Sequence, residues 1–141
     1  KESDKPAVAS LGAALVQLGF RLVATRGTAR CLQEAGVESE FVNKATGGRP
    51  NVIDLLKNEQ IDLIVNTTEG HTSLRDSAMI RRLALQNKVC YTTTLTGGEA
   101  FSIAIRHLQE QAAGNHGVEG QPITVRRLQD LNRSLVARQT G

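Results

Sequence analysis

Short apolar runs alternate with longer amphipathic segments along this chain. The apolar runs are rich in Val, Ile and Leu, as buried strands are, and we expect strands at residues 20–24, 37–42, 62–65 and 89–91. Between them apolar residues recur at helical spacing, which predicts helices at residues 4–18, 29–35, 52–56, 73–87 and 99–111. Strands that alternate with helices predict an α/β fold, here a three-layer open parallel sheet of Rossmann-like type with helices on both faces.

The two ends of the chain depart from this pattern. Such folds normally open with a strand, whereas this chain opens with a helix, so we expect a fifth strand, the first of the sheet, upstream of Lys1. Residues 1–112 then form the folded domain, and the glycine-containing stretch 113–122 is expected to be a linker. Residues 123–141 are expected to form an amphipathic helix or tail with a solvated basic face. Its expected role is to pack against another part of the protein or to serve as a tether.

Composition and charge exclude several classes of function. The 141 residues are enough for one domain with its own core. A net charge of +3, with three Phe, one Tyr and no Trp, is not typical of a nucleic-acid-binding surface. No segment has the length and apolarity of a membrane span. Cys31 and Cys90 lack the spacing of metal ligands, and their apolar surroundings fit small core residues in a reducing cytoplasm.

Polar, glycine-containing turns follow three of the predicted strands, at residues 25–28, 66–70 and 92–98. Because the carboxyl ends of parallel strands lie at one edge of a sheet, we expect these turns side by side. Glycine lets backbone amides approach an anion, threonine hydroxyls donate to it, and helix N-termini add partial positive charge. Lys5 and Lys44 can add full charges. The sequence therefore predicts a binding pocket for a phosphate or carboxylate group.

Each turn also has a simpler explanation. A Thr-x-Gly-Thr turn such as 25–28 is more often a plain strand-to-helix connection, and Asn66-Thr67-Thr68 is equally well a helix cap. The chain has no Walker-type lysine motif and no GxGxxG, which disfavours ATP hydrolysis and dinucleotide binding. It also has no recognisable acid–base pair and no Ser-His-Asp set, so we assign no catalytic and no metal-binding residue. We therefore expect the pocket to bind an anionic ligand and not to catalyse a reaction.

Six motifs occur along the chain in a fixed order. They are FRLVATRGT at 20–28, VNK at 42–44, GRP at 48–50, IVNTT at 64–68, Asp-Ser with Ile-Arg-Arg within 76–82, and TTLTGG at 93–98. In these motifs the chain resembles the C-terminal methylglyoxal-synthase-like domain of the bacterial carbamoyl phosphate synthetase large subunit. The likeness runs from about residue 4 to about residue 108. It implies the methylglyoxal-synthase-like fold and a regulatory, non-catalytic domain without a cofactor of its own, in a parent enzyme that uses ATP and Mg²⁺.

The resemblance also implies which residues hold an effector. A nucleotide phosphate would be held by Lys5, Thr25, Gly27, Thr28, Lys44, Asn66, Thr67 and Thr68. The ribose and base would be contacted by Asp76, Ser77, Met79 and Ile80. The residues that match the family's ornithine contacts are Tyr91, Thr92 and Thr93. Ornithine-binding members often have Asp where this chain has Thr92, and the change removes a partner for the ornithine amine.

The partners implied by the resemblance are effectors and other parts of the same enzyme. UMP would inhibit, and IMP and ornithine would modulate or activate. The protein partners would be the catalytic domains of the same large subunit, the glutaminase small subunit and further copies of this domain. The enzyme would be cytoplasmic and would serve pyrimidine and arginine biosynthesis.

Two alternatives to this function remain open. Methylglyoxal synthase shares the fold, but the Gly-Gly-Asp motif that carries its proton-abstracting aspartate aligns with Gly47-Gly48-Arg49 here. A cation in place of the aspartate leaves the abstraction of a proton from dihydroxyacetone phosphate without an evident base. The other alternative is a freestanding nucleotide-binding module, which only flanking sequence would distinguish.

Overall fold

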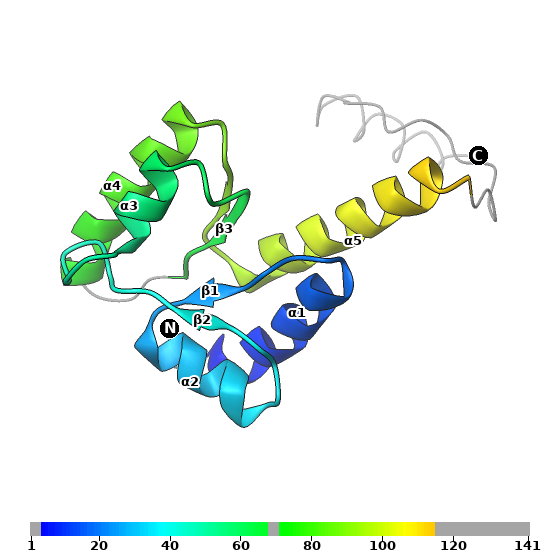
Figure 1. The fold of residues 1–141 in the computed structure, drawn as a ribbon, viewed down its shortest axis with the longest axis horizontal. Coiled ribbons are helices and arrows are strands. Elements are labelled where there is room, and N and C mark those ends of the chain that lie inside the picture. The colour runs from blue at the N-terminus through cyan, green and yellow to red at the C-terminus, as the bar shows by residue number, and fades with distance from the viewer. Residues whose placement is uncertain (1–3, 68–70, 115–141) are drawn as a thin grey trace, which may run out of the picture. The chain divides into compact units, whose positions relative to one another are not determined.

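Helices and short strands alternate in the protein, as the sequence predicts (Figure 1). The computed structural model describes residues 4–67 and 71–114 of the chain. The helices of this part are α1 Lys5–Gln17, α2 Arg26–Glu34, α3 Val52–Lys57, α4 His71–Gln86 and α5 Leu95–Ala112. The strands are β1 Val23–Ala24, β2 Glu40–Phe41, β3 Leu63–Val65 and β4 Cys90–Thr92. In the described residues, no helix is long and apolar enough to cross a membrane.

The strands pair in parallel, β1 with β2 and β3 with β4, which confirms the α/β class. Within the described residues the two pairs form separate two-stranded sheets. An opening of about 320 Å³ lies between the starts of β1 and β3, lined by Val23 on one side and by Gln60 and Asp62 on the other. A further strand in this opening would join the pairs into one sheet, but the fifth strand expected upstream of Lys1 stays a prediction.

The domain limits expected from the sequence are not tested either. Residues up to Gln109 form one compact unit. Apart from residues 113 and 114, the expected linker and the expected tail helix lie outside the described residues.

Three helices begin earlier than expected, of which α4, at His71 instead of residue 73, differs least. α2 starts at Arg26 instead of residue 29, because Thr25 has the extended backbone of an N-cap residue and its carbonyl accepts from Ala29 N–H at 2.8 Å. α5 starts at Leu95 instead of residue 99, so Gly97 and Gly98 lie inside the helix. Glycine has a low helix propensity, so the sequence pattern predicted a start of α5 that is too late.

Packing explains why a glycine is tolerated in the first turn of α5. Gly98 is buried, and a Cβ on it would lie 2.7 Å from Leu11 Cδ2 and 3.1 Å from Val65 Cγ2. The missing side chain therefore lets α5 approach both α1 and the end of β3. Gly98 serves helix packing and does not open the turn to an anion.

The main core cluster lies among α3, β3 and α4. It consists of Ile53, Leu56, Ile64, Ile80 and Ala84, each at most 9% exposed. On α4, the buried residues Ser77, Ile80 and Ala84 have the spacing of one helical face, and this face packs toward β3. Burial of Ile64 and Ile80 thus fixes the position of α4 relative to the end of β3.

We expect Leu56→Ala to lower the free energy of unfolding by about 2–5 kcal/mol, because Leu56 is 0% exposed and its removal leaves a cavity. The control is Leu85→Ala on α4, which removes the same atoms from a residue that is 80% exposed and should change stability by less than about 0.5 kcal/mol. Urea unfolding of both variants measures the difference. Equal losses would contradict the assignment of the core.

Candidate functional site

The loops that follow the parallel strands at their carboxyl ends carry the predicted binding residues. Residues 25–28 follow β1, residues 42–51 follow β2, and Asn66 and Thr67 follow β3 directly. Thr68 and residues 69 and 70 lie outside the described residues.

The N-terminus of α2 is open. Within the described residues, the Thr25 side chain makes no capping hydrogen bond to this helix, so it leaves the first-turn amides for another acceptor. Lys5 lies next to this turn, since its Nζ is 4.0 Å from where a Cβ on Gly27 would sit. Cys31 Sγ contacts the Lys5 carbonyl oxygen at 3.1 Å and so joins α1 to α2 here. The Lys5 ammonium group and the first-turn amides of α2, which the Thr25 side chain does not cap, therefore lie together at the end of β1.

The loop between β2 and α3 holds Lys44 and is fixed at both ends. Asn43 Nδ2 donates to the Pro50 carbonyl at 3.0 Å, and Gly47 N–H donates to the Lys44 carbonyl at 2.9 Å. Asn51 closes the N-terminus of α3 with a capping box, in which its side chain accepts from Ile53 N–H and Asp54 N–H. The backbone around the exposed Lys44 is thereby held in one conformation.

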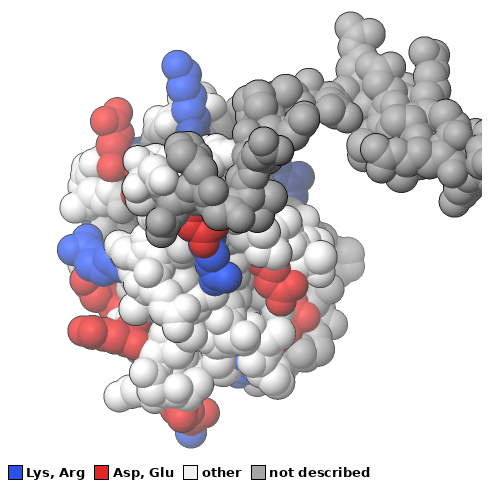
Figure 2. All heavy atoms as spheres, turned by 90° about the vertical axis from the view of Figure 1, so that its right-hand side faces the viewer, with Lys and Arg blue, Asp and Glu red and all other residues white. Residues whose placement is uncertain are grey.

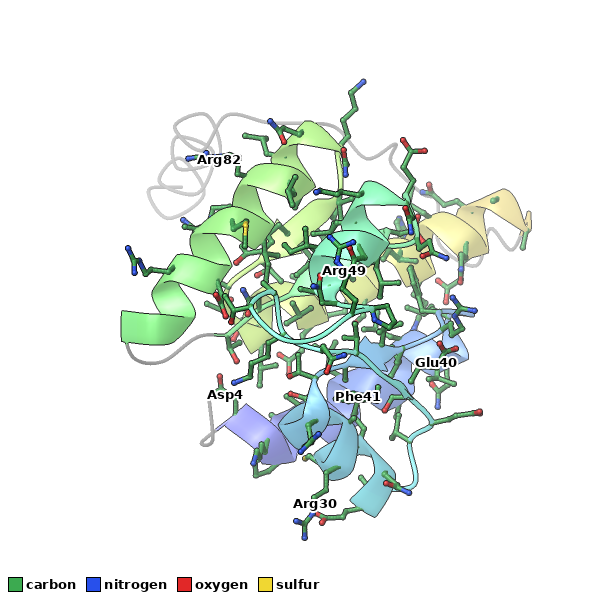
Figure 3. The ribbon with its side chains drawn as sticks, turned by 60° about the vertical axis from the view of Figure 1, so that its left-hand side comes forward. Asp4, Arg30, Glu40, Phe41, Arg49 and Arg82 are labelled. Atoms are coloured by element: carbon green, nitrogen blue, oxygen red, sulfur yellow. The ribbon has the colours of Figure 1, made fainter. Side chains whose placement is uncertain are left out.

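Arg49, in the position of the methylglyoxal synthase aspartate, lies beside α3 (Figure 3). Its Nη2 is 3.7 Å from Asp54 Oδ1, and its side chain is 81% exposed. The Asp54 side chain is 21% exposed, so only the arginine end of this pair lies in solvent.

Asn66 connects β3, α4 and β4. Its backbone N–H donates to the Thr92 carbonyl at 2.9 Å. Its side-chain Nδ2 donates to Ser77 Oγ at 2.7 Å and to Tyr91 Oη at 3.0 Å. Ser77 is 3% exposed, so this network is shielded from solvent on the α4 side. The Arg81 guanidinium lies over the Tyr91 ring, 5.6 Å from its centroid.

One contact that the sequence reasoning missed joins the β2–α3 loop to α4. Thr46 Oγ1 donates to Asp76 Oδ2 at 3.1 Å. The two residues are 30 positions apart, and no local pattern relates them. Asp76, expected at the ribose, is thus held next to the loop that carries Lys44.

The structure does not bring all of the predicted residues together. Ile80 is 9% exposed and belongs to the core. Met79 is 42% exposed and lines a groove on the outer side of α3 and α4, together with Arg75, Arg82 and Leu83. The expected contact of Met79 and Ile80 with a base stays a prediction.

The hydroxyls that follow β4 have local partners. Thr94 N–H donates to Thr92 Oγ1 at 3.3 Å, and Gly97 N–H donates to Thr94 Oγ1 at 3.0 Å. Thr93 is exposed. The Thr92 and Thr94 hydroxyls therefore shape the start of α5, whereas the Tyr91 hydroxyl contacts the Asn66 side chain.

Charges do not gather on the part of the surface that Figure 2 shows, where acidic and basic side chains are interspersed. The pKa of Arg30 is raised by a hydrogen bond to Glu34 at 2.8 Å and by the charge of that carboxylate. This pair lies along α2 and not at the strand ends. Within residues 4–67 and 71–114, no cluster of three or more His, Cys, Asp or Glu side chains could hold a metal ion.

Comparison with known proteins gives a consistent set of relatives. A family model described as the MGS-like domain matches residues 7–93. The chain is 47% identical over 137 residues to the carbamoyl phosphate synthase large chain of Pseudomonas aeruginosa, and the match covers 97% of this chain and 12% of that protein. The corresponding protein of Halomonas eurihalina is 46% identical over 132 residues, 94% of this chain and 11% of that protein. The corresponding protein of Xylella fastidiosa is 50% identical over 101 residues, and the match covers 72% of this chain and 9% of that protein.

We expect Asn51→Ala to lower the free energy of unfolding by about 0.5–2 kcal/mol, because the capping box at α3 is lost. Asn58→Ala, at the other end of α3, is the control and should change stability by less than about 0.5 kcal/mol. Thermal or urea unfolding measures both. An Asn51 variant as stable as the control would show that the capping box does not fix this loop.

Proposed function

This chain belongs to the MGS-like domain family, and we propose that it is the effector-binding regulatory domain of a carbamoyl phosphate synthase large chain. It spans about a tenth of the length of the relatives it matches, so the activity of a whole enzyme is part of the proposal. In that enzyme the catalytic domains of the same chain, with ATP and Mg²⁺, and the glutaminase subunit carry out the synthesis. This domain binds effectors, in the cytoplasm.

The observation that carries the proposal is the open N-terminus of α2 beside Lys5. Two helices, α2 and α3, begin at this edge after β1 and β2, and their N-termini differ in capping. α3 is closed by the Asn51 capping box, whereas the first turn of α2 receives no side-chain cap from Thr25. Open amides next to an ammonium group form a binding site for a phosphate dianion. Gly27 and Thr28 in this turn supply amides, and Thr28 and Thr25 supply hydroxyls.

Lys44 and Asp76 extend the site beyond the phosphate. The loop that carries Lys44 is tied to α4 by the Thr46–Asp76 hydrogen bond. A carboxylate such as Asp76 accepts hydrogen bonds from ribose hydroxyls, and the lysine adds a charge-assisted contact to phosphate. This combination suits a nucleoside monophosphate, with UMP and IMP as the proposed effectors.

Ornithine is the weaker candidate in this proposal. Thr92 supplies no carboxylate, and its Oγ1 already accepts from Thr94 N–H. The Tyr91 hydroxyl accepts from Asn66. The amine of ornithine therefore lacks a negatively charged partner on β4.

We expect UMP and IMP to bind the protein and to raise its Tm, since a ligand that binds the folded state stabilises it. Isothermal calorimetry with UMP, IMP and ornithine in turn, and a thermal scan with each, measure this. Ornithine should bind more weakly than the nucleotides. No heat and no Tm shift at millimolar UMP and IMP would contradict the proposed function.

We expect Lys44→Ala to weaken UMP binding by about tenfold or more, because a hydrogen bond to a charged group contributes on the order of 1.5–3 kcal/mol. Lys57→Ala, which removes an exposed lysine from the last turn of α3, is the charge-matched control and should leave the affinity unchanged. Calorimetry compares the two. Equal affinities of both variants would place Lys44 outside the site.

A further inference from the structure

We propose that the groove on the outer side of α3 and α4 binds an acidic amphipathic helix of another protein. The groove has a volume of about 510 Å³ and is lined by residues of both helices. None of the described residues expected to hold a phosphate lines it. The groove is therefore a second surface, and its role goes beyond the proposed binding of effectors.

The floor of the groove is apolar. It is formed by Ile53 of α3 and by Ala78, Met79 and Leu83 of α4. Ile53 is 9% exposed and Leu83 packs against the core cluster, whereas Met79 is 42% exposed. The floor is thus an extension of the core that reaches the surface between the two helices. Methionine adapts its shape to an incoming side chain, and it is enriched at protein-binding surfaces.

The rim of the groove is positively charged. Lys57 of α3 and Arg75 and Arg82 of α4 line it, all three exposed (Arg82 is labelled in Figure 3). Within residues 4–67 and 71–114, none of the three side chains forms an ion pair or a hydrogen bond, and no acidic residue lines the groove. Arg21 and Arg30, by contrast, each pair with a glutamate. The rim therefore carries positive charge that this part of the protein does not compensate.

The spacing of the charges indicates the shape of the occupant. Arg75 and Arg82 lie about two helical turns apart on α4, which is about 10 Å at the rise of an α-helix. Lys57 lies across the floor on α3. One small anion would reach one of these cations and leave the others unpaired. Carboxylates spaced along a helix reach several of them, and apolar side chains on the same helix fill the floor, as in other complexes of a helix with a groove.

Charge and shape also disfavour other occupants. Residues 115–141 of this chain carry four arginines against Glu119 and Asp130, so their net charge has the sign of the rim. The phosphates of a nucleic acid would pair with the rim but leave the apolar floor without an apolar partner. An anionic membrane is flat and cannot fill a groove between two helices. A protein helix with an apolar stripe and acidic flanks matches both the floor and the rim.

The probe is a synthetic alanine-based helix of about 18 residues, long enough to be helical on its own. It has leucines along one side and glutamates on both flanks of that side. Two comparison peptides replace the glutamates by lysines or the leucines by serines. Met79 is the only methionine of the chain, so a ¹³C-methyl methionine label places one NMR signal in the floor. Fluorescence anisotropy of the labelled peptides measures affinity in parallel.

We expect the acidic peptide to shift the Met79 signal saturably and to bind about tenfold or more tightly than either comparison peptide. In the double variant Arg75→Glu with Arg82→Glu, two attractive contacts become repulsive. It should bind the acidic peptide about tenfold or more weakly and should bind the lysine peptide instead. The charge-matched control is Lys88→Glu with Arg106→Glu, two exposed cations that do not line the groove. It should bind the acidic peptide as the unaltered protein does.

A change of preference from the acidic to the lysine peptide in the groove variant alone supports the proposal. No binding of the acidic peptide, equal binding of the acidic and lysine peptides, or an equal loss in the control variant would overturn it. Displacement of the peptide by UMP would assign the groove to the effector, and a Met79 shift caused by phosphatidylserine vesicles but not by the peptide would assign it to a membrane; either would overturn the proposal. The peptide result does not depend on whether UMP binds, so failure of the proposed function leaves it intact.

Discussion

The burial of one face of α4 against β3 determines most of the site. Ile80 packs with Ile64 in the core, and Ser77 lies on the same helical face one turn earlier. Asn66 follows β3 directly, so the packing that buries Ile64 and Ile80 also places the Ser77 hydroxyl 2.7 Å from the Asn66 amide. The polar network is thus a continuation of the apolar core, and its geometry is as rigid as the packing beneath it.

A second constraint sets the other walls of the site. Gly98 lets the start of α5 approach Leu11 and Val65, and a side chain there would force these elements apart. At the start of α3, the Asn51 capping box holds the loop that carries Lys44. A glycine and an asparagine, neither of which contacts a ligand, therefore decide where the strand-end loops lie.

The alternation of apolar runs and amphipathic segments is enough to predict the α/β class and the order of the elements. These features depend on local periodicity, which a sequence displays directly. The family resemblance was likewise confirmed, because its motifs are contiguous. The starts of α2 and α5 were wrong, since Gly27, Gly97 and Gly98 disfavour helix locally. The glycine at position 98 is explained by the close approach of α5 to Leu11 and Val65, which no local pattern displays. The Thr46–Asp76 contact joins residues 30 positions apart and has no local signal.

The Asn66 side chain joins β3 to both α4 and β4 through its hydrogen bonds to Ser77 and Tyr91. In an enzyme, the donors of an anion hole are fixed toward the developing charge before the substrate arrives, which is how they lower the barrier. Here the amide donors are satisfied inside the protein by Ser77 and Tyr91.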